Sequence, residues 1–271
     1  MIRIFSILAG LVFAAVLAWS LLWEVVATSQ DGLPKSAERE FGKQHELKAL
    51  ALSSDGPFGR FDRPQLQRGF KVYSEVCSTC HSLKYVAFRD LTALGYNADE
   101  VKAIAAKVQV PAYNTATGEV KTAPGKPTDK VPPVVYGGAG TPPDLSLITK
   151  ARHGGAAYVY SLLMGYQPQP AELIKKYPDA KTPDGLFYNP YFANLNLAMP
   201  APLASDGQVT YSDGTPATVD QMAKDVSAFL VWTAEPTLDK RKQTGWPVLG
   251  FLLFATVLAY LAKRNVWADK H

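Results

Sequence analysis

Two uncharged apolar stretches, one near each end of this 271-residue chain, set the first constraint on its fold. Residues 4–23 and residues 243–262 contain no Asp, Glu, Lys or Arg. Each has about the 20 residues that a helix needs to cross the hydrocarbon core of a bilayer. A spanning segment must satisfy its own backbone hydrogen bonds in lipid, which a helix does. The chain is therefore expected to be held by a membrane at one or both ends.

The second stretch has the borders of a transmembrane helix. Trp246 and Trp267 lie near its two edges, and two cations, Lys263 and Arg264, follow it. Interfacial tryptophans and flanking cations are typical of membrane spans and are not needed by a buried core helix. We expect a C-terminal transmembrane helix over residues 243–263, followed by a tail of residues 264–271.

The first stretch has two interpretations. Residues 1–28 are either a cleaved signal peptide or an N-terminal transmembrane anchor. Val25-Val26-Ala27 places small residues where a signal peptidase could cleave, but the apolar run is longer than a usual signal core. Both interpretations export the residues that follow, so residues 29–240 are expected to form a domain outside the cytoplasm.

Composition excludes several classes of protein. Hydrophobic residues make up 47% of the chain and charged residues 19%, which does not fit a disordered protein. The net charge is only +4, and the charged residues are scattered along the chain. Basic residues form no run beside aromatic ones, so a nucleic-acid partner is not expected. The 20 prolines and 20 glycines indicate a loop-rich domain.

Apolar periodicity predicts a mainly α fold. The expected helices are residues 64–79, 155–165 and 219–233, with a weaker one over 98–108, and long loops are expected over 110–145 and 166–215. Thr218, with Gln221 three residues on, resembles a capping box at the start of the third helix. Loops of such length in a small domain are usually functional or wrapped around something.

The two cysteines of the chain lie in one pentapeptide, Cys77-Ser78-Thr79-Cys80-His81. Two thiols about one helical turn apart can each form a thioether to a haem vinyl group, and the histidine then supplies an imidazole to the iron. This spacing is typical of c-type haem attachment. A zinc site would need four ligands, and no second cysteine pair or close histidine pair is present. A thioredoxin-like redox pair would need a preceding strand, where the pattern predicts a helix.

An electron-carrying haem usually has a second axial ligand besides His81. The candidates in the sequence are His45, His153, His271, Met164, Met199 and Met222. Met164 and Met222 belong to expected helices, where methionine more often fills a core. Met199 lies between alanines and prolines in Ala198–Pro202, a stiff loop that could present a thioether. We favour Met199, with His153 as the alternative.

The sequence resembles the cytochrome c1 family, whose members are the haem-bearing anchored subunits of the cytochrome bc1 complex. The matching stretches before the methionine are Gly56–Gly59, Leu66–Gly69, the haem pentapeptide, Pro142–Ser146, Ala151–Gly155, Tyr158, Ser161–Leu163 with Gly165-Tyr166, and Tyr188–Phe192. The later ones are Ala198–Pro200, Asp213–Ala217, Lys224–Val226 and Trp232–Pro236. The haem pentapeptide occurs in many cytochromes, whereas the combination of Arg152-His153-Gly154-Gly155 with the Ala-Glu-Pro before the anchor is much more specific.

The resemblance implies roles for three residues. Met199 would be the sixth iron ligand, Arg152 would pair with a haem propionate, and Tyr158 would lie near the haem. A guanidinium suits a carboxylate geometrically. From the residues alone, a solvated surface arginine and an ordinary core tyrosine would be the preferred interpretations of Arg152 and Tyr158.

The resemblance also implies a function and partners. The chain would transfer single electrons from a Rieske iron–sulfur protein to a c-type cytochrome, in a dimeric complex with cytochrome b. It would be the electron-carrying subunit of a quinol–cytochrome c oxidoreductase rather than a catalyst on its own. Residues 166–239 hold nine acidic and four basic residues, which could steer a basic acceptor or simply form a solvated face. Alternatives are another anchored cytochrome, such as an oxidase subunit, and a haem enzyme or sensor with an open iron position.

Two features depart from the family pattern. Some bacterial members carry a disulfide in the loop before the methionine, and this chain has no cysteine left for one, so residues 167–187 must be held otherwise. An uncleaved N-terminal anchor is also not expected of the family.

The membrane topology follows from haem attachment rather than from charge. Three cations, Lys240 to Lys242, precede the C-terminal span and three follow it, so the positive-inside rule does not decide. Thioether formation requires the exported compartment. We expect residues 30–240 in the periplasm or its organellar equivalent and residues 265–271 in the cytoplasm or matrix.

Overall fold

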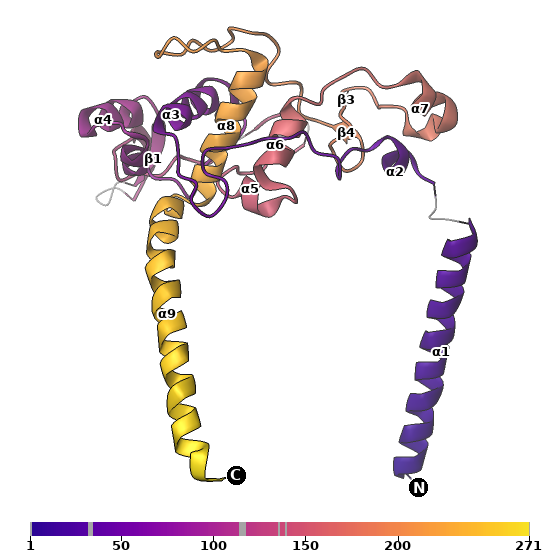
Figure 1. Cartoon of the computed structure of the whole chain (residues 1–271). Helices are drawn as coiled ribbons and strands as arrows, with labels where there is room; N and C mark the ends of the chain where they lie inside the picture. Colours follow the sequence, from indigo (N-terminus) through magenta and orange to yellow (C-terminus); the bar gives the residue numbers. More distant parts are fainter. Residues whose placement is uncertain (1, 32–34, 114–117, 135, 139, 271) are drawn as a thin grey trace. The chain divides into compact units, whose positions relative to one another are not determined.

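The computed structural model describes residues 2–31, 35–113, 118–134, 136–138 and 140–270, which fall into two units (Figure 1). The first unit comprises Met1–Phe41 with Ala171–Lys181, and the second comprises Gly42–Pro170 with Thr182–His271. The expected mainly α, loop-rich fold is confirmed, because the only strands in the described part of the chain are two short antiparallel pairs.

The first unit is helical. Its elements are α1 (Ile2–Asp31), α2 (Ala37–Phe41), α7 (Ala171–Lys176) and the 3₁₀ turn η3 (Pro178–Ala180). Glu40 accepts hydrogen bonds from the Lys176 ammonium and, at 2.9 Å, from the Tyr177 hydroxyl. The Tyr177 ring also meets Phe41 edge-on at 6.3 Å between centroids. These contacts join residues 171–181 to α2 without a disulfide.

The second unit holds the remaining elements. They are α3 (Arg63–Val72), the π-helical turn η1 (Tyr73–Cys77), the 3₁₀ helix η2 (Phe88–Leu94), α4 (Ala98–Ala106), β1 (Gln109–Tyr113), β2 (Val120–Pro124), α5 (Ile148–Ala151), α6 (Gly155–Leu163), β3 (Phe187–Tyr188), β4 (Asn196–Leu197), α8 (Val219–Ala234), α9 (Leu238–Trp267) and the 3₁₀ turn η4 (Ala268–Lys270). Strands β1 and β2 pair antiparallel from Gln109↔Pro124 to Tyr113↔Val120. Strands β3 and β4 form a ladder of two residue pairs.

Helices α3 and α8 cross at the centre of this unit, and a glycine allows their backbones to approach. A Cβ placed on Gly69 would lie 2.1 Å from the Asp225 carbonyl oxygen and 2.6 Å from the Phe229 Cβ, so no larger residue fits there. Phe70 and Trp232 pack against Phe229, with ring centroids 5.6 and 5.7 Å away. The α3–α8 crossing is therefore the core on which the rest of the unit is assembled.

An ion pair fastens the same crossing. The Arg68 guanidinium lies 2.9 Å from the carboxylate of Asp225, whose side chain is fully buried, and 2.7 Å from that of Asp213. Gln221 donates a further hydrogen bond of 2.9 Å to Asp225. A buried carboxylate is tolerated only when its charge and lone pairs are satisfied in this way.

The helices expected from periodicity are confirmed, with small shifts. α8 begins after Thr218, whose side chain accepts a 3.1 Å hydrogen bond from the Gln221 amide. The Gln221 side chain does not complete the expected capping box, because it donates to Asp225 instead. The helix expected over 64–79 ends earlier as an α-helix, at Val72, and continues as the π turn.

The two segments expected to be long loops contain short elements. The first holds the β1–β2 hairpin, and the second holds α7, η3 and the β3–β4 ladder. Strands of two to five residues give too few alternations to be recognised by period.

Two helices of the described residues are long and apolar enough to cross a membrane, Arg3–Ser29 within α1 and Leu238–Trp267, which is α9. The expected span of residues 243–263 lies inside α9, which begins earlier because its first turn belongs to the domain. There Leu238 is buried and Asp239 accepts a hydrogen bond from the Phe61 amide.

Candidate functional site

A cavity of about 790 Å³ lies within the second unit, and all six residues of the sequence prediction of the site line it. Cys77, Cys80 and His81 line one side, and Arg152 and Tyr158 belong to the segment of α5 and α6. Much of the remaining lining is apolar, including side chains of α6 and α8. The volume is in the range of binding sites for cofactors and other small ligands.

The π turn η1 delivers the first cysteine to this cavity. The Ser78 amide donates to the Tyr73 carbonyl at 2.8 Å, five residues back, where an α-helix would use a carbonyl four residues back. The chain then turns tightly, with the His81 amide donating to the Cys77 carbonyl at 2.9 Å. π turns are rare and are frequent at functional sites, because they shift the side chains that follow. As a result Cys77, Cys80 and His81 all line one cavity.

The His81 imidazole is oriented by the loop that contains Pro143. Nδ1 of His81 lies 2.7 Å from the carbonyl oxygen of Pro143, so Nδ1 carries the proton and donates it. The other ring nitrogen, Nε2, is then the one with a lone pair for a metal. The buried hydroxyl of Tyr73 donates to the His81 carbonyl oxygen at 2.8 Å and holds the backbone of the histidine. Burial raises the pKa of Tyr73, so it stays a donor at physiological pH.

Asp144 holds the Pro143 loop against the segment that follows the histidine. Its carboxylate accepts hydrogen bonds from the Ser82 hydroxyl at 2.8 Å and from the Lys84 amide at 2.9 Å. Partial burial alone would raise the pKa of Asp144, but hydrogen bonds from neighbouring amides and hydroxyls outweigh it and keep that pKa below its ordinary value. No role for Asp144 follows from the sequence, because Asp144 and Lys84 are 60 positions apart.

Met199 lines the same cavity from the segment that follows the β3–β4 ladder. The Tyr166 hydroxyl donates to the Met199 carbonyl oxygen at 3.0 Å. The turn before β4 passes through Leu195, whose φ of +65° is rare for a residue other than glycine. The backbone amide of buried Asn189 donates to the Leu195 carbonyl at 2.8 Å, and this hydrogen bond closes the turn. The methionine is therefore placed by a few specific hydrogen bonds rather than by a helix.

Among the described residues, the other candidates for a second axial ligand do not line the cavity. They are His45, His153, Met164 and Met222. Met222 is fully buried in the core, as its position on the apolar face of α8 predicted, and Met164 packs against that core. His153 is exposed. His271, the remaining candidate, lies outside the described residues.

Arg152 and Tyr158 both line the cavity and lie close enough to interact. Burial raises the pKa of the Tyr158 hydroxyl, and the neighbouring Arg152 charge opposes part of that rise. Arg152 is exposed, and in the part of the chain that the structure describes it forms no ion pair with a carboxylate. Its guanidinium is thus available to an anionic group bound in the cavity.

The donor set fits a c-type haem. Asn196 lines the cavity, and its buried Oδ1 has no hydrogen-bond partner among the described residues, which is what a polar atom beside an absent bound group shows. No group of three or more His, Cys, Asp or Glu residues in the described ranges could hold a bare metal ion. Burial and the nearby Cys80 raise the pKa of Cys77 to about 12, whereas a redox dithiol needs a lowered one.

Comparison with known proteins agrees with this geometry. The sequence model of the Cytochrome C1 family matches residues 52–270. The chain is 46% identical over 234 residues to cytochrome c1 of Rhodospirillum rubrum, covering 80% of this chain and 86% of that protein. It is 42% identical over 222 residues to the mitochondrial heme protein cytochrome c1-2 of Solanum tuberosum, covering 79% and 82%. It is also 44% identical over 240 residues to cytochrome b/c1 of Bradyrhizobium diazoefficiens, covering 80% of this chain and 35% of that longer protein.

The chain belongs to the cytochrome c1 family. It is a membrane-anchored electron-transfer subunit of the bc1 complex that binds haem c, and the Cys77–Cys80 pair fits covalent attachment of that haem. Binding of haem c, as in the cytochrome c1 family, accounts for a large cavity with a mostly apolar lining.

Several residues that build this cytochrome c1 site could not be found by sequence reasoning. Pro143, Asp144 and Tyr166 lie in stretches that carried the family resemblance, but no role followed from their types or spacing. Asn196 gave no signal at all. Each of these residues contacts a partner that is distant in sequence or acts through a backbone atom. Neither kind of contact leaves a recognisable pattern in the sequence.

Proposed function

We propose that this chain carries single electrons from a Rieske iron–sulfur protein to a c-type cytochrome acceptor, within a dimeric bc1 complex that also contains cytochrome b. In the proposed site, Cys77 and Cys80 would hold the haem through thioethers, and His81 and Met199 would ligate its iron. Arg152 would pair with a propionate, and Tyr158 would lie near the haem. The observation that carries the proposal is that His81 and Met199, 118 positions apart in sequence, line one cavity.

The chemistry of this ligand set favours electron transfer over catalysis on a substrate. Haem iron supplies reversible one-electron oxidation and reduction. With His81 and Met199 both ligating, no iron position is left for a substrate or a gas. A thioether ligand raises the reduction potential relative to a second imidazole, which suits a carrier that accepts electrons from an iron–sulfur protein and passes them to another cytochrome.

The residues of the chain have separable tasks in this proposal. His81 is kept in one tautomer by the Pro143 carbonyl, so that Nε2 has the lone pair that would ligate the iron. Tyr166 fixes the Met199 backbone at 3.0 Å. The mostly apolar lining would limit the access of water to the haem and would help to set its reduction potential.

The partner cytochrome b has independent support. A relative 44% identical over 240 residues bears the name cytochrome b/c1, and this chain matches only 35% of its length. A protein with that name and surplus length is consistent with a c1 part joined to a b part. We propose that this chain meets cytochrome b in the membrane through α9.

The ligand assignment is tested by Met199→Leu with Met164→Leu as the matched control. Met199→Leu is expected to abolish the weak sulfur-to-iron band at the red edge of the oxidised spectrum and to lower the reduction potential. Met164→Leu is expected to change neither, because Met164 packs against the core and does not line the cavity. Loss of the band in Met164→Leu but not in Met199→Leu would contradict the assignment.

The electron path is tested in the isolated complex. Quinol-driven reduction of the haem on this chain is expected to stop when the Rieske protein is removed, while direct chemical reduction continues. Co-purification of the chain with a copper or haem oxidase, in place of a b-type cytochrome, would overturn the proposed partners.

The location of the haem domain is proposed to be the periplasm, or its organellar equivalent, for residues 29–240, with residues 264–271 in the cytoplasm or matrix. Two of the three cations before the span are engaged in the fold, since Arg241 pairs with Glu235 and Lys242 binds backbone carbonyls. A reporter active only in the cytoplasm should work when fused after His271 and be silent when fused after Pro236. The reverse pattern would refute this topology.

A further inference from the structure

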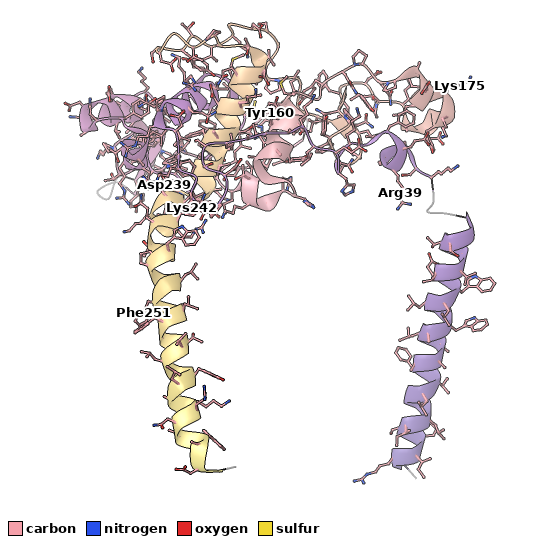
Figure 2. The ribbon with its side chains drawn as sticks, viewed as in Figure 1. Arg39, Tyr160, Lys175, Asp239, Lys242 and Phe251 are labelled. Carbon is pink, nitrogen blue, oxygen red and sulfur yellow. The ribbon has the colours of Figure 1, made fainter. Side chains whose placement is uncertain are left out.

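The loop of residues 53–61 is fastened to the first turns of α9, at the level where that helix becomes apolar. Figure 2 labels Asp239 and Lys242 at the end of α9 that joins the domain, and Phe251 further along the helix. The Lys242 ammonium donates to the carbonyl oxygens of Ser54 at 2.6 Å and of Gly56 at 2.5 Å. One turn earlier, Asp239 accepts from the Phe61 amide at 3.1 Å. We refer to these contacts as the Lys242 clasp.

Glycines make the clasped loop tight. Gly56 has a φ of +67°, in the left-handed region that side chains rarely adopt. A Cβ on Gly59 would lie 1.9 Å from the Asp55 carbonyl oxygen, so the backbone closes on itself at that point. The Gly59 carbonyl is the third acceptor of Lys242, at 3.3 Å. Because three carbonyls of the loop bind the same ammonium, Phe58 at the tip of the loop has a defined position.

Phe58 is presented outward at that position. It is 75% exposed, and its ring stacks on Trp246 with centroids 4.9 Å apart and planes 9° from parallel. Trp246 lies at the start of the uncharged stretch of residues 243–262, which is where a spanning helix leaves the aqueous phase. The stacked pair thus places a second aromatic ring, from the haem domain itself, beside the interfacial tryptophan of the anchor.

We propose that the Phe58–Trp246 pair lies in the lipid headgroup region and that Phe58 contacts phospholipid directly, so that the 53–61 loop is a membrane-binding element of the haem domain. The continuity of the pair with the membrane span decides the occupant. An exposed apolar ring beside an interfacial tryptophan gains by entering the headgroup and acyl boundary. The Lys242 clasp then holds the haem domain at a fixed height above the membrane.

The test is photocrosslinking in native membranes with the complex intact. The photoreactive residue p-benzoylphenylalanine is placed at position 58, and in a control at position 205. Ser205 is also exposed, but its neighbour Asp206 accepts a hydrogen bond from the Val219 amide at the start of α8, the end of that helix opposite α9 (Figure 1). Position 58 is expected to yield an adduct with the mass of one phospholipid, and position 205 none. An adduct of position 58 with another protein subunit only, or no adduct, would overturn the proposal.

A second pair of variants tests the clasp in the same assay. With the photoreactive residue kept at position 58, Lys242→Met is expected to reduce the lipid adduct several-fold, because the loop loses the ammonium on which its carbonyls converge. Lys240→Met, at an exposed neighbouring position, is the matched control and should leave the adduct unchanged. The haem c absorbance reports that both variants fold. An unchanged adduct in Lys242→Met would refute the role of the clasp.

Discussion

The two sides of the cavity are built differently. The side that carries Cys77 and His81 continues from α3, which is fastened to α8 by the close approach at Gly69 and by the buried pair of Arg68 and Asp225. The side that carries Met199 is a loop with a ladder of two residue pairs, held by single hydrogen bonds from Tyr166 and through Asn189. One side draws on the core of the unit, and the other depends on a few polar contacts.

The difference indicates which side of the cavity should open first. Local opening occurs where few apolar contacts and few shared hydrogen bonds must be broken. We expect Met199 to leave the iron before His81 does, and damage to the helical side to affect the fold as a whole. Four substitutions test this contrast, from the largest expected effect to the smallest.

Arg68→Met should destabilise the whole second unit, since it leaves the buried Asp225 carboxylate without its ionic partner. Breaking a buried pair by removing one member typically costs about 3–5 kcal/mol. Thermal unfolding followed by circular dichroism should show this loss, together with a lower yield of haem-bearing protein. Lys71→Met, which removes an exposed pair with Glu75 at 3.1 Å, is the control and should cost less than about 0.5 kcal/mol. Equal losses in the two variants would show that the α3–α8 pair does not carry the stability of this side.

Asn189→Ala should loosen the Met199 side alone. Buried Asn189 donates to the Leu162 carbonyl at 2.8 Å and accepts from the Tyr191 amide at 3.1 Å, so the variant leaves the Tyr191 amide without its acceptor and removes one donor to the Leu162 carbonyl. The expected cost is about 2 kcal/mol. The sulfur-to-iron band should disappear at a lower temperature than in the parent, while the far-ultraviolet dichroism melts little earlier. If the band and the helices melted together, the two sides would not be independent.

Tyr166→Phe removes only the hydroxyl that donates to the Met199 carbonyl. A single hydrogen bond contributes about 1 kcal/mol, which corresponds to about a fivefold change in an equilibrium constant. Added imidazole should therefore displace the methionine about five times more readily than in the parent protein. Tyr113→Phe, at an exposed position on β1, should leave imidazole binding unchanged. The same affinity in Tyr166→Phe and the parent would remove Tyr166 from the account of Met199.

Asp220→Asn should have the smallest effect, on the helical side and only above acidic pH. Hydrogen bonds from Lys224 and then from Tyr160 hold the pKa of Asp220 below its ordinary value. A lowered folded-state pKa adds stability above the unfolded value of about 3.9, and that stability is lost as the pH falls through the folded value. Because the carboxylate is partly exposed, the loss at pH 7 should stay below about 1 kcal/mol. The melting curves of variant and parent should differ at pH 7, and the difference should shrink as the pH falls below the unfolded value of about 3.9 and through the folded value. A difference that stays constant as the pH falls would assign the effect to packing.

The features that the sequence predicted are those written in short patterns. The haem pentapeptide, the uncharged stretches of residues 4–23 and 243–262, and the start of α8 at Thr218 each depend on residues a few positions apart. Met199 is favoured over His153 because its loop is stiff. The structure supports that preference, since Met199 lines the cavity and His153 does not. Met199 as the ligand remains a prediction.

Tertiary structure alone decided the contacts that hold these features in place. Nδ1 of His81 meets Pro143 across 62 positions, Tyr166 meets Met199 across 33, and Lys242 meets Ser54 across 188. In each of these contacts the acceptor is a backbone carbonyl, which every residue possesses, so no side-chain pattern marks it. The sequence by itself therefore predicted which groups this protein uses for its chemistry and its anchor. The packing of α3 on α8, and the loops carried by it, decided how those groups are oriented, because orientation arises from atoms that become neighbours only when the chain has folded.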